Sequence, residues 1–170
     1  MEVRKILDAG VTNTFGEFPL ASSPVSTSRK SSRCLLCSHL AAEIGEEYNI
    51  RQEQSESTDD LLSLGLRLVP FLLSHNGEAD AVDLLLELEA IREIIPFVDS
   101  NTFPRVCLYM VSCVSLLPPP DDVEFLKTAR VLYRKHQRFT EALTLSIRLQ
   151  DTEAIKEDFE APTNPLAYPL

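Results

Sequence analysis

The residues best suited to metal chemistry lie in the segment "CLLCSH", which contributes Cys34, Cys37 and His39. Two thiolates and an imidazole at this spacing are half of a structural zinc site, and a full site needs a second ligand pair close by. Cys107 and Cys113 occupy positions of one expected helix that do not face each other, so they are poorly placed to complete it. We therefore expect no metal and no other cofactor, and we interpret the cysteines as thiols of a reducing compartment.

A basic cluster in "YRKHQR" (133–138) offers a different chemistry, the binding of an acidic partner or a phosphate. Its cations are Arg134, Lys135 and Arg138. The same residues can instead neutralise the negative C-terminal end of the helix that carries them and cap its carbonyl groups. Both interpretations stay open, and these three cations are the candidate partner-binding residues.

Catalytic chemistry has no comparable candidate in this sequence. Carboxylates are abundant, but in "EIGEE" and "ELEAIRE" they recur at the spacing of solvated helix faces. The sequence contains no phosphate-binding loop, no His-Glu-x-x-His pattern and no nucleophile elbow. We predict that the protein is not an enzyme and has no catalytic residues.

The composition narrows the classes of partner. The 170 residues carry a formal net charge of −10, which argues against a nucleic-acid surface because phosphate binding requires clustered cations. No apolar run is long enough to span a membrane, and the first residues lack the apolar core of a secretion signal. We therefore expect no nucleic-acid or membrane partner and a location in the cytoplasm and nucleus.

The pattern of apolar residues predicts an all-α protein in three parts. Residues 1–33 form a Ser-rich arm without periodicity, which we expect to be disordered. Residues 34–160 repeat apolar side chains at helical spacing, with the helices ending at polar linkers and prolines. Residues 161–170 form a Pro-rich tail that cannot be helical. The predicted helices include 78–89, 91–98, 103–117, 139–149 and 152–159.

One pattern occurs twice in the helical part. The segment "EADAVDLLLELEAIREIIPF" (78–97) is echoed by "RFTEALTLSIRLQDTEAIKEDF" (138–159), so that Ala81 and Leu85 align with Ala142 and Ser146. Repeated helix pairs suggest stacked hairpins, because a single hairpin cannot bury its apolar face alone. A plain helical bundle remains the alternative, since amphipathic helices made of Ala, Leu and Glu resemble one another.

Long stretches of the helical part resemble a known family. They are similar to the N-terminal helical region of the large non-ATPase scaffold subunit of the 26S proteasome base, over about residues 38–160. The stretches that carry the resemblance are "SHLAAEIGEEYNIRQ" (38–52), "LLSHNGEADAVDLLLELEAI" (72–91), "RVCLYMVSCVSLLPPPDD" (105–122) and "LYRKHQRFTEALTLSIRLQDTEAI" (132–155). Residues 1–37 and the segment after Phe159 do not resemble the family.

The resemblance implies an α-solenoid without catalytic activity that acts as a structural part of the regulatory particle in ubiquitin-dependent protein degradation. It implies partners among the base ATPase subunits and the other regulatory-particle subunits. The family's ubiquitin-receptor sites lie in a ring of repeats that this sequence lacks, so none has a matching position here. A free-standing helical-repeat adaptor that binds a peptide or a partner helix is the alternative function.

Overall fold

The computed structural model describes residues 27–161, and within that range it is helical and contains no strand. The predicted all-α class is therefore confirmed. The predicted tail at 161–170 lies outside the described residues except for Ala161, and so does the predicted arm except for its last residues. The chain forms two compact units, Met1–Glu89 and Ala90–Leu170. No helix in the described part is long and apolar enough to cross a lipid bilayer.

The first unit contains three helices, α2 (Thr27–Glu53), α3 (Asp59–Ser74) and α4 (Glu78–Glu87). Each of them packs against the other two. Helix α3 buries the face that carries Leu64, Leu68 and Leu72 against its neighbours and exposes the face that carries Arg67. Its Gly65 lets Leu88 approach closely, because a Cβ atom at residue 65 would lie 2.4 Å from Leu88 Cδ1.

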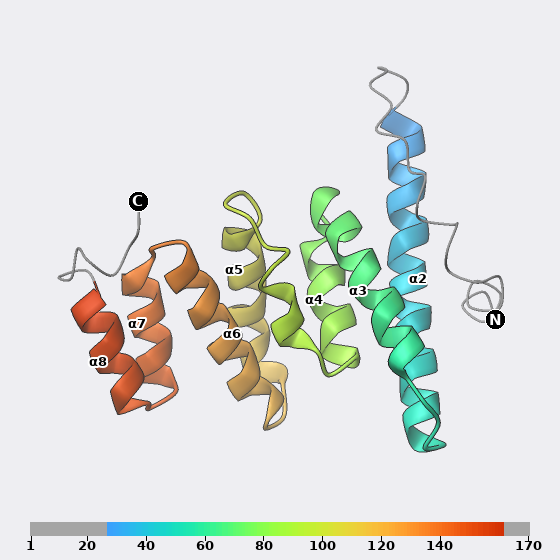
Figure 1. Cartoon of the computed structure of the whole chain (residues 1–170). Helices are drawn as coiled ribbons and strands as arrows, with labels where there is room; N and C mark the ends of the chain where they lie inside the picture. The colour runs from blue at the N-terminus through green and yellow to red at the C-terminus, as the bar shows by residue number, and fades with distance from the viewer. Residues whose placement is uncertain (1–26, 162–170) are drawn as a thin grey trace. The chain divides into compact units, whose positions relative to one another are not determined.

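The second unit is a series of short helices, η1 (Ile91–Ile94), α5 (Phe103–Cys113), η2 (Val114–Leu116), α6 (Asp121–Lys135), α7 (Phe139–Arg148) and α8 (Thr152–Glu160). Helices α5 to α8 follow one another side by side in chain order (Figure 1), and each packs on the next. This serial packing within the unit is the stacked-hairpin arrangement that the repeated sequence pattern predicts.

Most helix corners share one backbone device. Five residues with positive φ angles follow helix ends, and four of them, Ser55, Asn76, Gln137 and Gln150, share one hydrogen-bond pattern. At each of these corners the next residue donates its backbone N–H to a carbonyl five positions earlier, as Gly77 does to Leu72 at 2.9 Å. This left-handed closing residue satisfies carbonyl groups at the helix end and turns the chain into the following helix.

Three boundaries differ from the sequence-based prediction. Helix α2 begins at Thr27, within the predicted disordered arm 1–33, rather than at Cys34. The predicted helix 91–98 is only a 3₁₀ turn that ends at Ile94, because Pro96 has no N–H to continue an α-helix. The predicted helix 103–117 changes to a 3₁₀ turn after Cys113, and Leu117 is extended because Pro118 disfavours helical backbone before it.

Candidate partner-binding surface

The three cations of the basic cluster point to three different places in the second unit. Arg134 lies on α6 and donates from Nη1 to Glu157 Oε2 at 2.7 Å. Lys135 donates from Nζ to the carbonyl oxygens of Ile95 and Val98, at 2.7 and 3.1 Å. Each of these two side chains thus holds another part of the same unit, and the cluster does not form a single cationic patch.

Arg138 is an exposed member of the cluster that makes its ion pair close by in the sequence. Its side chain is 55% exposed and pairs with Glu141 on the first turn of α7. The hydrogen bond from Arg138 is the main reason why the pKa of Glu141 is below its ordinary value. The partner-binding role of the cluster stays a prediction, and Arg138 is the residue at which it can be tested without disturbing the packing.

A buried ion cluster joins α6, α7 and α8, and sequence reasoning did not find it. The Asp158 side chain has no solvent exposure and accepts from Arg130 Nε at 2.7 Å and from Arg130 Nη2 at 3.0 Å. Arg134 Nη1 lies 3.1 Å from the same carboxylate, and the Ser146 hydroxyl donates to it. A carboxylate this deeply buried is tolerated only because its charge is paired and its oxygens are hydrogen-bonded.

Hydrogen bonds within the cluster shift the pKa values of Arg130 and Glu157. Burial acts to lower the pKa of the Arg130 guanidinium, but its hydrogen bonds to Asp158 and Glu157 outweigh burial and raise that pKa. The pKa of Glu157 is lowered, first by the hydrogen bond from Arg130 and then by the one from Arg134. Both shifts favour the charged forms of Arg130 and Glu157, which pair across α6 and α8 and help to hold α8 on α6.

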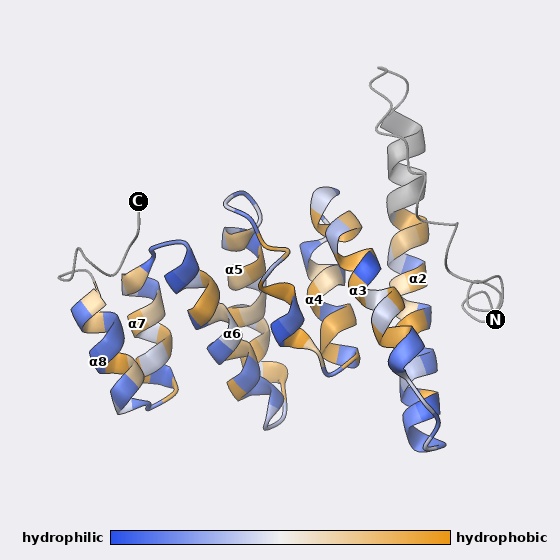
Figure 2. Cartoon of the chain, viewed as in Figure 1, coloured by the Kyte–Doolittle hydropathy of each residue, from blue (hydrophilic) through white to orange (hydrophobic). Residues whose placement is uncertain are grey.

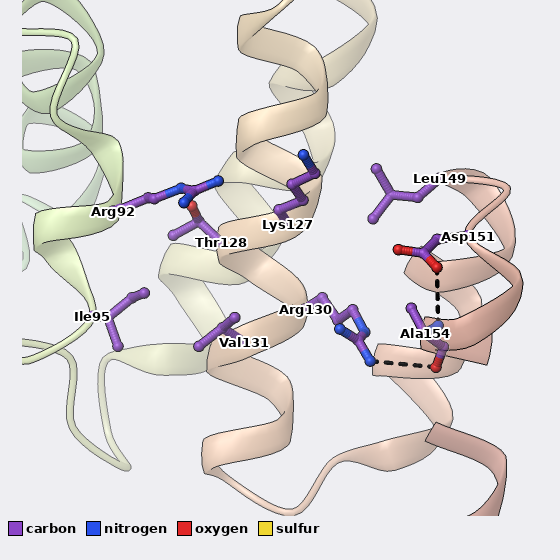
Figure 3. Close-up of a pocket in the computed structure, with 9 residues that line it drawn as sticks. All are labelled: Arg92, Ile95, Lys127, Thr128, Arg130, Val131, Leu149, Asp151 and Ala154. Atoms are coloured by element: carbon purple, nitrogen blue, oxygen red, sulfur yellow. Dashed lines mark hydrogen bonds between the residues drawn. The ribbon is translucent and has the colours of Figure 1, made fainter. Parts of the chain in front are cut away.

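A groove of about 350 Å³ opens on the second unit beside this cluster. Residues of α6 lie between its two walls, which are formed by η1 and by the α7–α8 corner (Figure 3). The lining residues are Arg92, Ile95, Lys127, Thr128, Arg130, Val131, Leu149, Asp151 and Ala154. The size falls at the lower end of the range of about 300–1,000 Å³ for ligand pockets.

The wall formed by α8 is fixed by two hydrogen bonds that are drawn in Figure 3. Asp151 caps the N-terminus of α8 by accepting from the backbone N–H of Ala154 at 3.0 Å. Arg130 donates from Nη2 to the carbonyl oxygen of Ala154 at 3.3 Å. The groove is thus a preformed feature of the unit, with one wall tied directly to α6.

The rim of the groove carries two exposed cations that share one carboxylate. Arg92 Nε donates to Glu124 Oε2 at 2.6 Å, whereas Lys127 Nζ lies 3.5 Å from Glu124 Oε1. The hydrogen bond from Arg92 is the main cause of the lowered pKa of Glu124. Arg92 and Lys127 are 63% and 49% exposed, so donor groups remain available to a ligand at this rim.

The residues considered for metal binding are dispersed among the described helices. Cys37 is buried, His39 is exposed, and no group of three or more metal-ligating side chains occurs among the described side chains of residues 35–161, which do not include Cys34. Burial raises the pKa of the Cys107 thiol to about 12, which makes it unreactive at neutral pH. His136 stacks on Phe103 with ring centroids 4.2 Å apart, as part of the packing of the second unit.

The serial hairpins, the internal ion pairs and the groove beside them define a helical-repeat domain. Comparisons with known proteins identify the family to which this domain belongs. The chain belongs to the RPN1 N-terminal domain family, whose sequence pattern matches residues 36–168. The match continues beyond residue 160, where the resemblance seen in the sequence ended, and so includes most of the Pro-rich tail.

Relatives from three organisms are longer than this chain, and the chain matches only part of each. The chain is 56% identical over 128 residues to the 26S proteasome regulatory subunit rpn1 of Schizosaccharomyces pombe, which covers 75% of this chain. It is 53% identical over 123 residues to the 26S proteasome regulatory subunit rpn-1 of Neurospora crassa, and this match covers 72% of this chain. It is 42% identical over 126 residues to the 26S proteasome non-ATPase regulatory subunit 2 of Dictyostelium discoideum, covering 74%. The chain spans only 14% of the length of each relative.

Proposed function

We propose that this chain is a non-catalytic structural component of the 26S proteasome regulatory particle. The observation that carries the proposal is the family match over residues 36–168, together with the regulatory and non-ATPase subunits named among the relatives. The described helices suit a structural part, because the buried carboxylate of Asp158 and its arginine partners hold α8 on α6.

In this proposal the chain belongs to the base of the regulatory particle and supports ubiquitin-dependent protein degradation and regulation of the proteasome. Its partners are the base ATPase subunits and other regulatory-particle subunits, in the cytoplasm and nucleus. The partner-binding role of Arg134, Lys135 and Arg138 belongs to the same proposal. Arg138 is the member best placed to meet a partner, since Arg134 and Lys135 are engaged within the unit.

The test is to express the tagged chain and isolate 26S particles through a different subunit. Mass spectrometry should then find the peptide "EDFEAPTNPLAYPL" in particles that sediment as intact complexes. Arg138→Glu should lower the recovered amount, whereas Arg148→Glu, an equal charge change on the exposed surface of α7, should not. Absence of the peptide from purified particles at normal expression of the chain would refute the proposal.

A free-standing adaptor is the second candidate, and the groove of the second unit is the observation that favours it. An adaptor would capture a peptide or a partner helix in cells whether or not proteasomes are present. A pull-down that recovers the same partner after 26S particles have been removed by sedimentation would support it. Recovery of proteasome subunits alone would support the structural component.

A further inference from the structure

We propose that the groove between η1, α6 and the α7–α8 corner binds a short peptide segment of another protein in which an acidic side chain is flanked by aliphatic ones. The proposal goes beyond the structural role, because it concerns a recognition site that acts whether or not the chain joins a proteasome. It rests on the charge of the rim, the apolar walls and one hydroxyl group without a partner.

The charge at the rim suits an acidic ligand. Arg92 and Lys127 share the single carboxylate of Glu124, and only Arg92 is held at a short distance. The 3.5 Å separation leaves the Lys127 ammonium with a weak contact and free donor capacity. In a chain whose net charge is −10, the two exposed cations beside Glu124 are a local site of complementary charge for a carboxylate, whereas Asp151 lines the opposite wall, where it caps α8.

The walls suit aliphatic side chains on both sides of that carboxylate. Ile95 and Arg92 come from the η1 side of the groove and Leu149 comes from the opposite side, with Val131 of α6 between them (Figure 3). Val131 is 42% exposed although it is apolar, so a ligand that covers it would remove hydrophobic surface from water. A peptide can supply apolar groups on both sides of a carboxylate, whereas a fatty acid has its carboxylate at one end.

Thr128 provides the independent sign of a ligand. The residue is 1% exposed and lines the groove, yet its Oγ1 atom has no hydrogen-bond partner within the described residues. A buried hydroxyl without a partner costs free energy that a hydrogen bond from or to a ligand would recover. In Figure 3 Thr128 lies toward the Arg92 side of the groove, away from Leu149.

The volume sets the size of the ligand. A cavity of about 350 Å³ holds a few side chains rather than the whole face of a helix. The ligand is therefore a short linear segment, which binds by two or three anchoring side chains.

The test uses the full-length chain and a fluorescein-labelled peptide in which Glu and Leu alternate, with a matched peptide of Lys and Leu as its counterpart. We expect saturable binding of the acidic peptide by fluorescence anisotropy and none of the basic one. The double variant Arg92→Glu with Lys127→Glu should weaken binding by at least about tenfold, because it reverses the charge of the rim. Arg148→Glu, on the exposed surface of α7, should change it by less than about twofold.

Thr128→Val tests the hydroxyl separately, because valine has nearly the same shape. The variant should raise the melting temperature slightly and weaken binding of the acidic peptide by about threefold to tenfold. Amide chemical shifts of Lys127, Val131 and Leu149 should move on titration of the acidic peptide. No binding at about 1 mM peptide, or unchanged binding by the double variant, would overturn the site. Displacement of the peptide by decanoate at lower concentration than by unlabelled peptide would overturn its assignment to a peptide.

Discussion

The hairpin α3–α4 of the first unit and the hairpin α7–α8 of the second unit have the same plan but different interiors. The buried residues of the first are almost entirely aliphatic, namely Leu61, Leu64, Leu68, Val69, Leu72, Leu73, Ala81, Val82, Leu84 and Leu85. The second buries only the apolar residues Ala142, Leu145 and Ala154, together with the polar residues Ser146 and Asp158. Helix α8 is predominantly hydrophilic along its length, as Figure 2 shows.

The difference shows how one repeated pattern can be stabilised in two ways. Leu85 and Ser146 occupy aligned positions in the repeat, and both are completely buried. Leu85 needs only close packing, whereas Ser146 needs a hydrogen-bond partner, which Asp158 supplies. The first hairpin thus depends on apolar burial, and the second depends on charges that must all be present together.

The largest expected effect comes from breaking the ion cluster. Asp158→Ala leaves Arg130 and Arg134 without the buried carboxylate, and it should lower the free energy of unfolding of the second unit by about 3–5 kcal/mol. Urea unfolding followed by circular dichroism measures the change. Leu72→Ala in α3 is the matched control for an apolar hairpin and should cost about 2–5 kcal/mol through lost burial and a cavity.

A triple replacement separates the charge from the shape. Asp158→Ile with Ser146→Leu and Arg130→Met turns the ionic interior into an apolar one, and replacements of this kind are neutral or stabilising by about 1–4 kcal/mol in other proteins. We expect the triple variant to regain most of the stability lost in Asp158→Ala. A loss below about 1 kcal/mol in Asp158→Ala would contradict the ionic character of the second hairpin.

A smaller effect is expected from acid. The pKa of Glu157 is lower in the folded chain than its ordinary value of 4.5, mainly because of its hydrogen bond from Arg130. The unfolded chain therefore takes up the proton first, so the stabilisation is complete above the ordinary pKa and is lost as the pH falls through the folded pKa. Between about pH 5 and about pH 3, amide exchange in α8, corrected for its intrinsic rate, should speed up more than exchange in α3.

Two variants show whether Glu157 is the cause of that acid sensitivity. Glu157→Gln should remove most of the difference between α8 and α3, because the amide no longer titrates. Glu153→Gln, on the exposed face of the same helix, should leave the difference in place. An unchanged acid response in Glu157→Gln would assign the sensitivity to another carboxylate of the second unit.

The smallest effect is expected at a corner between the helices of the second hairpin. Gln150 has a φ angle of 55°, a conformation that costs energy in any residue with a Cβ atom and little in glycine. Gln150→Gly should raise the free energy of unfolding by about 0.5–1 kcal/mol, measured by urea unfolding. Thr144→Gly, within α7, should lower it by a similar amount because glycine disfavours helix. Destabilisation by both variants would show that the corner tolerates Gln150 without strain.

The helices were predictable from the sequence because local signals determine them. Apolar residues at helical spacing predicted α4 and α7 closely, and the repeated pattern identified their common plan. The short helix predicted at 91–98 was wrong because Pro96 competes with the apolar pattern and leaves only a 3₁₀ turn. The effect of Pro96 comes from a missing backbone hydrogen bond, whereas the spacing of apolar side chains gives no information on backbone hydrogen bonds.

The ion cluster and the groove were not predicted, because they depend on residues far apart in the chain. Arg130 and Asp158 meet only after α6, α7 and α8 have packed. One signal was present: Asp158 lies four positions after Ala154, on the face of α8 that the helical pattern places inside. Arg134 was singled out for its charge, but its use inside the unit follows from a carboxylate that the local sequence does not bring near.

Two thiols that are buried in the described part of the chain provide one natural reporter for each unit. Cys37 lies in α2 of the first unit and Cys107 in α5 of the second, and neither side chain is appreciably accessible in the folded chain. With Cys34 and Cys113 replaced by serine, the rate at which an alkylating reagent traps each thiol would follow the opening of its own unit. The same molecule can then be assayed for partial unfolding, one half at a time, without an added dye.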